Sequence, residues 1–297
     1  MRERHKPHGI PSQIAHRSRG RKQKTPHRRV RPDSGIWLFI TPSIPGSRHN
    51  VHVLTNHPLK AVFWDFDGTL ADTRERNLNV NRRIVEEVTG RPWSEVAGLT
   101  SVEAYVAAWN HVSNWQQLYT KSFGLTEEQC ATAGQRWAAF QLNDTTPVPL
   151  LAEIEDTLKR LRKFPQAVVS QNERATIAQI LKENHVDHYF TAIVGYAEVP
   201  LDRQKPAPDG LLRALDIVGI EEPATALYIG DHETDILCSV NTNRDLVAMG
   251  RDCRFLSVAA FYLNGNRGSE WSATPDYRVY RPREINQLVD RLCVRNI

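Results

Sequence analysis

The chain of 297 residues has few of the features that mark secreted, zinc-binding or membrane proteins. Its four cysteines form no Cys-x-x-Cys pair and have no neighbouring histidine at metal-ligand spacing, so they are typical of reduced, mostly buried thiols. No apolar stretch approaches the roughly 20 residues that cross a bilayer. The apolar run at residues 36–40 is also shorter than a signal-peptide core of about 7 to 15 residues. We therefore expect a cytoplasmic protein that does not enter a membrane.

Acidic residues are scarce in the first 50 positions, where 12 lysines and arginines stand against Glu3 and Asp33 and give a net charge of +10. The whole chain carries +4, so residues 51–297 carry −6. This mildly acidic remainder argues against a nucleic-acid-binding function for the protein as a whole. Almost no apolar periodicity occurs before Ile36, and such a segment cannot bury enough surface to order itself. We expect residues 1–55 to be a basic, disordered extension.

Three interpretations of this extension compete. It is a solvated tail or an upstream stretch wrongly included in the reading frame; it is an electrostatic arm for RNA, DNA or another anionic surface; or it is an organelle transit peptide. The Arg-rich composition fits a transit peptide, but the missing amphipathic helix does not. Met249 is the only methionine after Met1, so a later start would need a non-AUG codon. Nucleic acid is expected as a partner only through this tail.

From Leu59 onward, short apolar runs alternate with helical patterns, which indicates a parallel sheet with crossover helices. Each run is followed by a loop and a helix-like stretch, so the predicted fold class is α/β, a doubly wound parallel sheet. The predicted strands are residues 60–65, 166–170, 192–195, 226–230 and 245–249.

About a hundred residues between the first two predicted strands have helical patterns only. Gly90 is a stop signal for the first helix, and Thr126 with Gln129 forms a capping box that begins the third. We expect an all-helical cap domain, residues 74–147, inserted as a lid into a catalytic core made of residues 56–73 and 148–297. Helices are predicted over residues 74–89, 101–123 with a break near 113–114, 126–142 and, as the crossover, 149–163.

The first predicted strand leads into Asp65 and Asp67, followed by Gly68 and Thr69. A strand leaving the core would deliver both carboxylates at its carboxyl end, where open α/β sheets bind their ligands. Gly68 would let backbone amides approach a phosphate closely. Two strand-end aspartates can also merely cap a turn, and a bare Asp-x-Asp pair would favour that alternative. The motifs downstream decide between the two.

A second apolar run, residues 226–230, also ends in aspartate. Asp231 follows it directly and Asp235 lies one helical turn later, so both carboxylates can face the same space. With Asp65 they supply the hard oxygen ligands that Mg²⁺ prefers. The alternative, an N-cap role for Asp231 or Asp235 in the next helix, is compatible with metal binding.

Two loops add further polar side chains. Ser170 ends a predicted strand and Asn172 follows it, although a strand-end serine is more often a turn residue than a ligand. Lys205 is ordinarily a solvated residue, but two prolines stiffen its loop just ahead of an apolar helix at residues 210–218. A lysine held in this way can keep its charge beside a phosphate.

These motifs, in this order, resemble the haloacid dehalogenase superfamily, specifically its phosphatase branch with a helical cap, as in phosphoglycolate phosphatases and β-phosphoglucomutases. The resemblance covers roughly residues 59–290 and implies a Rossmann-like core. It implies that Asp65 is the nucleophile and Asp67 the general acid/base. The phosphate-binding residues would be Gly68, Thr69, Ser170, Asn172 and Lys205, and the Mg²⁺ site would be formed by Asp65, Asp67, Asp231 and Asp235.

The resemblance implies a Mg²⁺-dependent phosphatase that hydrolyses a small-molecule phosphate monoester, phosphoglycolate-like or sugar-phosphate-like, through an aspartyl phosphate. Asp67 favours phosphate esters, because the dehalogenase branch lacks a carboxylate at that position. The expected partner is a small phosphorylated metabolite, and the expected state is a monomer or homodimer. The alternatives are a phosphomutase of the β-phosphoglucomutase type and a non-catalytic binding protein on the same fold.

The helical insertion says little about the substrate. Its four tryptophans are predicted to form its core, and its arginines are expected to be solvated rather than part of the site. Lys121, its only lysine, is more simply a solvated helix residue than the imine-forming lysine of the phosphonate-cleaving branch. The residues concerned are Trp93, Trp109, Trp115 and Trp137, with Arg74, Arg76 and Arg136.

Overall fold

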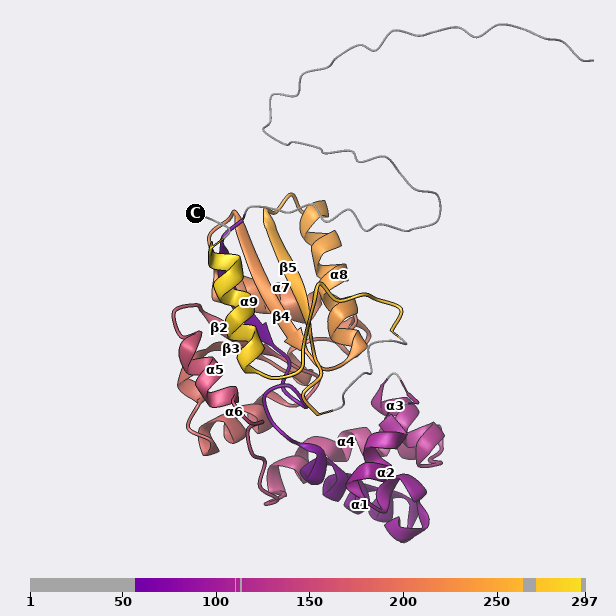
Figure 1. Ribbon diagram of the computed structural model, residues 1–297. Helices are drawn as coiled ribbons and strands as arrows, with labels where there is room; N and C mark the ends of the chain where they lie inside the picture. Colours follow the sequence, from indigo (N-terminus) through magenta and orange to yellow (C-terminus); the bar gives the residue numbers. More distant parts are fainter. Residues whose placement is uncertain (1–56, 110, 113, 264–270, 295–297) are drawn as a thin grey trace, which may run out of the picture. The chain divides into compact units, whose positions relative to one another are not determined.

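The computed structural model describes residues 57–109, 111–112, 114–263 and 271–294 (Figure 1). The predicted basic extension at residues 1–55 lies outside these ranges, and its predicted disorder therefore stays a prediction.

The described residues contain one six-stranded sheet in the order β3-β2-β1-β4-β5-β6, with every neighbouring pair parallel. The apolar sequence of β1 suits a central strand that is covered on both faces, and β2 and β4 flank it. The predicted α/β fold class is confirmed. The strands are β1 (Leu59–Trp64), β2 (Gln166–Val169), β3 (Phe190–Val194), β4 (Ala224–Gly230), β5 (Cys253–Ala260) and β6 (Tyr277–Val279).

Helices cover both faces of the sheet, as Figure 1 shows. On one face, Val62 and Trp64 of β1 share a buried cluster with α5 (Ile154–Arg160), α6 (Arg174–Glu183) and α9 (Arg283–Val294). On the other, Ala61 and Phe63 pack with α7 (Asp209–Val218) and α8 (Glu233–Ala248). The alternation along β1 therefore leaves Asp65 at the end of a strand that is fixed from both sides.

Among the described residues, four α-helices lie between β1 and α5, and several of their ends follow the predicted signals. The first ends at Gly90, whose φ of 68° is left-handed and whose N–H donates to Glu86. The capping box of Thr126 and Gln129 is present. Asn114 caps a new helix at the predicted break, because its side chain accepts a hydrogen bond from the N–H of Gln117. The helices are α1 (Arg74–Thr89), α2 (Val102–Trp109), α3 (Trp115–Gln117) and α4 (Glu127–Asn143), with a π-helical turn at Leu118–Ser122.

These four helices enclose a hydrophobic cluster of their own. The four tryptophans that were predicted to form its core pack against it as half-buried side chains. Arg74 pairs with Asp72 and Arg136 with Glu87. Arg76 departs from the expected solvated state. It is 3% exposed and its Nε donates to the carbonyl of Thr146 at 2.7 Å.

The strand predicted at residues 245–249 is wrong, because these residues form the end of α8 and the start of the following turn. The buried positions of α8 include Ser239 and Thr242 as well as Leu246, so the sequence of this helix lacks a regular apolar period. Only the short apolar run at the end of α8 was recognised, and it was interpreted as a strand. The fifth and sixth strands of the structure, β5 and β6, were not predicted. The crossover helix α5 is shorter than predicted, since Glu153 adopts a left-handed φ of 67° just before it. Short 3₁₀ turns lie at Trp93–Glu95, Ala97–Leu99, Asp187–Tyr189, Tyr196–Glu198 and Leu201–Arg203.

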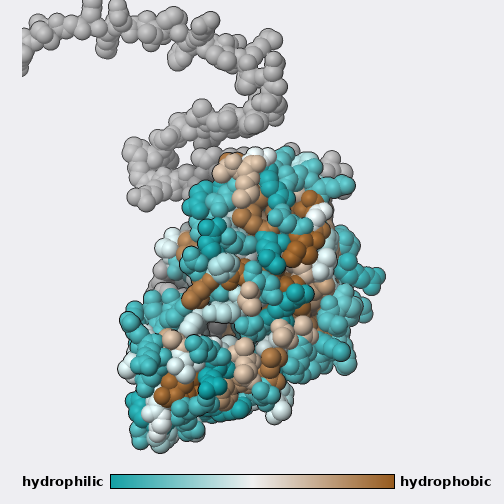
Figure 2. Space-filling model, turned by 180° about the vertical axis from the view of Figure 1, so that it is seen from behind, coloured by the Kyte–Doolittle hydropathy of each residue, from teal (hydrophilic) through white to brown (hydrophobic). Residues whose placement is uncertain are grey.

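Hydrophilic side chains predominate on the face shown in Figure 2, and apolar ones form separate patches among them. In the part of the chain that the structure describes, no helix combines the length and apolarity that crossing a bilayer requires.

Candidate active site

Asp65 lies directly beyond the carboxyl end of β1, where the chain turns sharply. Its N–H donates to the carbonyl of Ile229 at 2.7 Å, so the strand pairing with β4 extends to the carboxylate-bearing residue. The side chains on either side of it, Trp64 and Phe66, are fully buried. Because both neighbours are fixed in the core, Asp65 is held rigidly at the edge of the sheet.

Gly68 makes the turn after Asp67 possible. Its φ of +74° is left-handed, and an added Cβ would lie only 2.5 Å from Oδ2 of Asp231. The amide of Gly68 donates to the carbonyl of Ala71 at 2.9 Å and that of Thr69 to Phe66 at 3.3 Å. The family resemblance implied that both residues bind phosphate, and this role stays a prediction; in the structure their amides donate to carbonyls within the turn. Thr69 is also fully buried, and its Oγ1 has no hydrogen-bond partner among the described residues.

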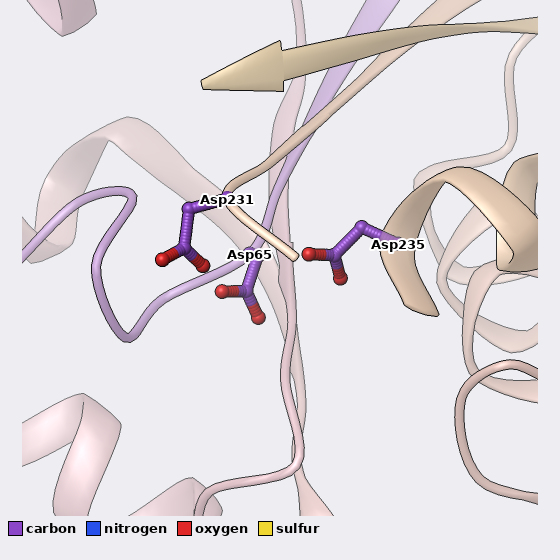
Figure 3. A group of neighbouring side chains, drawn as sticks. All are labelled: Asp65, Asp231 and Asp235. Atoms are coloured by element: carbon purple, nitrogen blue, oxygen red, sulfur yellow. The ribbon is translucent and has the colours of Figure 1, made fainter. Parts of the chain in front are cut away.

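Three carboxylates from two neighbouring strands and one helix come together at this edge (Figure 3). Asp65 follows β1, Asp231 follows β4 and Asp235 lies in the first turn of α8; one ligand oxygen of each lies within 4.8 Å of the others. Carboxylates this close repel one another unless a cation lies between them. Their hard oxygen atoms fit a divalent ion such as Mg²⁺.

Lys205 reaches this group from the loop before α7. Its Nζ lies 2.6 Å from Oδ1 of Asp65 and 2.7 Å from Oδ1 of Asp235. The loop itself is held by α8, since Asn241 donates to the carbonyl of Pro206 at 2.9 Å and the Cys238 thiol to that of Ala207 at 3.2 Å. A buried ammonium group is therefore fixed between two carboxylates. The predicted place of Lys205 beside a phosphate stays a prediction.

The environment acts differently on the two partners of this ion pair. Burial raises the pKa of Asp65 to about 7; Lys205 opposes this effect, whereas Asp235 and Asp67 add to it. Burial opposes the charge of Lys205, but Asp235 and Asp65 outweigh it and raise the pKa of the ammonium group above its usual range. Lys205 is therefore charged, and Asp65 is sensitive to any further cation placed near it.

Asp235 is held by groups that the sequence did not single out. The hydroxyl of Tyr228 lies 3.0 Å from its Oδ1, and the N–H of His232 donates to its Oδ2 at 3.1 Å. A Cβ at Gly230 would lie 2.3 Å from the Asp235 carboxyl carbon, so only glycine fits the end of β4. Tyr228 lies inside an apolar strand. Its polar hydroxyl was the only feature of the sequence that could have indicated a buried hydrogen-bond partner.

Asp67 occupies a separate cluster of hydrogen-bond donors. Asn172 Nδ2 lies 3.2 Å from its Oδ1 and 3.3 Å from its Oδ2, and the Ser170 hydroxyl lies 3.4 Å from Oδ2. Ser170 and Asn172 were predicted to bind phosphate, and the structure brings both to the Asp67 carboxylate. A third donor, Asn77 Nδ2, lies 3.4 Å away and was not predicted.

The loop after β5 is attached to the site through Glu233. Its carboxylate accepts hydrogen bonds from Ser272, by backbone and hydroxyl, and from the Ala273 N–H at 3.3 Å. His232 caps α8, with its ring accepting from the N–H of Thr234. These two residues between Asp231 and Asp235 therefore fix α8 and the nearby loop.

Comparison with known proteins agrees with this arrangement. The family model for haloacid dehalogenase-like hydrolases matches residues 62–249. A phosphoglycolate phosphatase from Aquifex aeolicus is 32% identical over 236 residues, which cover 78% of this chain and 97% of the relative. Phosphoglycolate phosphatase 1 from Pseudomonas aeruginosa is 27% identical over 185 residues, 61% of this chain and 65% of the relative.

A solved structure shows the same fold. The crystal structure of a predicted phosphatase from Clostridium acetobutylicum superimposes with a TM-score of 0.60 at 20% identity, covering 79% of this chain and 99% of that one. The fold is a parallel Rossmann-like α/β sheet, and its carboxylate-rich edge fits a hydrolase that uses aspartates. The chain belongs to the haloacid dehalogenase-like hydrolase family. It is an enzyme of the phosphatase type within that family, similar to the phosphoglycolate phosphatases.

Proposed function

We propose that the protein is a Mg²⁺-dependent phosphatase that hydrolyses a small-molecule phosphate monoester through an aspartyl phosphate on Asp65. One observation carries this proposal: Asp65, Asp231, Asp235 and Lys205 meet at one sheet edge, with Asp67 two residues beyond the nucleophile. The relatives named as phosphoglycolate phosphatases support a small phosphorylated metabolite, phosphoglycolate-like or sugar-phosphate-like, as the substrate.

The proposed chemistry has two steps. A carboxylate oxygen of Asp65 attacks phosphorus, the bond from phosphorus to the ester oxygen breaks, and its electron pair stays on the departing oxygen. Asp67, carrying a proton at that moment, donates it to this oxygen, so the alcohol leaves neutral. The Asp67 carboxylate then takes a proton from water as the water oxygen bonds to phosphorus. The bond from phosphorus to the Asp65 oxygen breaks, its electron pair returns to the Asp65 carboxylate, and inorganic phosphate is released.

Charge stabilisation is assigned to the groups around the nucleophile. Lys205 lies 2.6 Å from Asp65 and can contact an equatorial phosphate oxygen on the bound group. Ser170 and Asn172 reach the same space from the end of β2 and orient Asp67. We assign Gly68 and Thr69 to the turn that lets the phosphate approach.

The carboxylates of Asp65, Asp231 and Asp235 and the backbone carbonyl of Asp67 would hold the metal. When bound, Mg²⁺ would supply positive charge that lowers the repulsion between the Asp65 carboxylate and the phosphate dianion. Asp235 already accepts hydrogen bonds from Lys205 and the His232 N–H, so we assign it to orienting Lys205 as well.

We further propose that residues 74–147 act as a cap domain that selects the substrate, and that the enzyme works in the cytoplasm. The test of the proposed function is hydrolysis of p-nitrophenyl phosphate with and without Mg²⁺. Wild-type protein should release p-nitrophenol only with the metal, and purified Asp65→Asn should release none while keeping the wild-type circular dichroism spectrum. Substantial activity in Asp65→Asn would overturn the scheme. A panel of phosphoglycolate, sugar phosphates and nucleotides would then identify the substrate.

A further inference from the structure

Asn77 connects the helical insertion to the carboxylate of Asp67. It lies one turn into α1, and its Nδ2 is 3.4 Å from Oδ1 of Asp67 and 3.2 Å from the hydroxyl of Thr73. The other two donors to Asp67, Ser170 and Asn172, come from the end of β2. Among the described residues, Asn77 therefore supplies the insertion's side-chain hydrogen bond to the proposed acid.

Gln141 of α4 fixes which end of the Asn77 amide faces Asp67. Its Nε2 donates to Oδ1 of Asn77 at 2.6 Å, so the Asn77 oxygen is directed to Gln141 and the Asn77 nitrogen to Asp67. The reversed amide would place the two NH₂ groups together and would point the Asn77 oxygen at the Asp67 carboxylate. Both contacts would then be repulsive, because like ends of the dipoles would meet.

The Asn77–Gln141 hydrogen bond joins α1 and α4 but leaves a buried polar atom without a partner in the described part of the chain. Gln141 is 1% exposed, and its Oε1 has no hydrogen-bond partner among the described residues. A buried polar atom without a partner loses its hydrogen bonds to water and gains none in return, whereas an apolar side chain would pack α1 against α4 without this loss. Helix packing alone therefore does not account for the pair, and the contact with Asp67 supplies the missing reason.

We propose that Asn77 is a positioning residue that holds Asp67 in place to protonate the leaving group, and that Gln141 acts only by orienting Asn77. The inference rests on the proposed function, since it assigns the proton transfer to Asp67. In that transfer the O–H bond of Asp67 breaks as a new O–H bond forms on the departing oxygen, which keeps the electron pair of its former bond to phosphorus. The need for this proton differs between leaving groups.

Two substrates of similar shape distinguish a loss of leaving-group protonation from a general loss of activity. p-Nitrophenolate is stable as an anion and needs little protonation, whereas phenolate is a poorer leaving group and needs more. In Asn77→Leu, kcat/KM for phenyl phosphate should fall at least ~30-fold, and that for p-nitrophenyl phosphate by less than ~3-fold, because general acid catalysis contributes typically 10²–10⁴-fold. Asn77→Asp, nearly identical in shape, should show the same selective loss and serves where the leucine variant folds poorly.

Two further variants complete the design. Gln141→Leu should cause a smaller selective loss, and adding it to Asn77→Leu should cost nothing more, since it acts through Asn77. Asn79→Leu is the matched control: it removes an asparagine from the same helix whose amide contacts Thr146 at 3.1 Å, and it should leave the ratio of the two substrates unchanged.

Equal losses with both substrates, or an unchanged ratio in Asn77→Asp, would overturn the positioning role while leaving the proposed function standing. Failure of the wild-type protein to hydrolyse p-nitrophenyl phosphate with Mg²⁺ would instead contradict both the proposed function and the positioning role of Asn77. The two failures are therefore distinguishable in one set of assays.

Discussion

At the scale of single residues, the site depends on how one ammonium group and three carboxylates share a buried space. Asp65 is 7% exposed, and Lys205 contacts both it and Asp235. A single positive charge is thus shared by two carboxylates, while Asp231 completes the group. The net negative charge that remains is what would attract a divalent ion.

Metal binding should therefore release protons. Burial raises the pKa of Asp65 to about 7, so below this pH the metal-free carboxyl is mostly protonated and must lose its proton to bind a cation. Calorimetric titration with Mg²⁺ in buffers of different ionisation enthalpy should detect proton release on the acidic side of neutral pH that declines toward zero as the pH rises well above the pKa of Asp65. Asp65→Asn should abolish the release. Release that is independent of pH would contradict this assignment.

Several residues of the site could be predicted because strand ends are visible in sequence. Asp65, Asp231 and Lys205 each stand beside an apolar run or a proline-stiffened loop, and the structure brings them together. Tyr228, Asn77 and Gln141 could not be predicted in this way. Each contributes through a contact across the fold, and a lone tyrosine in a strand or a lone amide on a helix has no spacing that indicates its partner.

At the scale of elements, the tight turn after β1 fits closely against the end of β4. Gly68 has a φ of +74°, and its missing Cβ leaves the space that the Asp231 carboxylate occupies. The site therefore depends on the turn as well as on the strands that it joins.

A pair of glycine substitutions tests this close fit. Gly68 and Gly90 both have left-handed φ angles, of +74° and +68°, but only at Gly68 would a Cβ meet another group within 4 Å. Alanine at either position should lower the free energy of unfolding by about 1 kcal/mol. Only Gly68→Ala should also lose activity, by up to ~10²-fold in kcat/KM, because the Asp231 carboxylate must move by about an ångström. Equal activities in the two variants would show that Asp231 is not constrained by the turn.

Element boundaries were predictable where capping chemistry marks them. α1 ends at Gly90 and α4 begins after Thr126, both as predicted, because left-handed glycine and the capping box act locally. The end of α8 was mistaken for a strand, since its buried face is partly polar and Val247 is 77% exposed. There, tertiary packing rather than local pattern decides the structure.

At the scale of the whole molecule, charge is divided between the first 50 residues, at +10, and the rest of the chain, at −6. All the catalytic and metal-binding groups proposed above come from residues 65–235. The basic segment therefore supplies none of them, and any role it has in binding anionic polymers is separable from catalysis.

Truncation tests this separation. A protein lacking residues 1–50 should hydrolyse p-nitrophenyl phosphate with kcat/KM within roughly twofold of the full chain, because the site keeps every group that it needs. Retention of the full-length protein on a heparin column at low salt should be lost in the truncated one. A large fall in kcat/KM on truncation would show that the basic segment takes part in the site.

The most direct test of the central claim is to look for the phosphoryl group on Asp65. Enzyme mixed with substrate and Mg²⁺, then quenched in acid within milliseconds, should yield a peptide containing residues 61–72 that is heavier by one phosphoryl group. Reduction with borohydride should convert Asp65 in that peptide to homoserine. The same treatment of Asp65→Asn should give no modified peptide. Turnover without any phosphorylated peptide, or modification at another residue, would contradict the account.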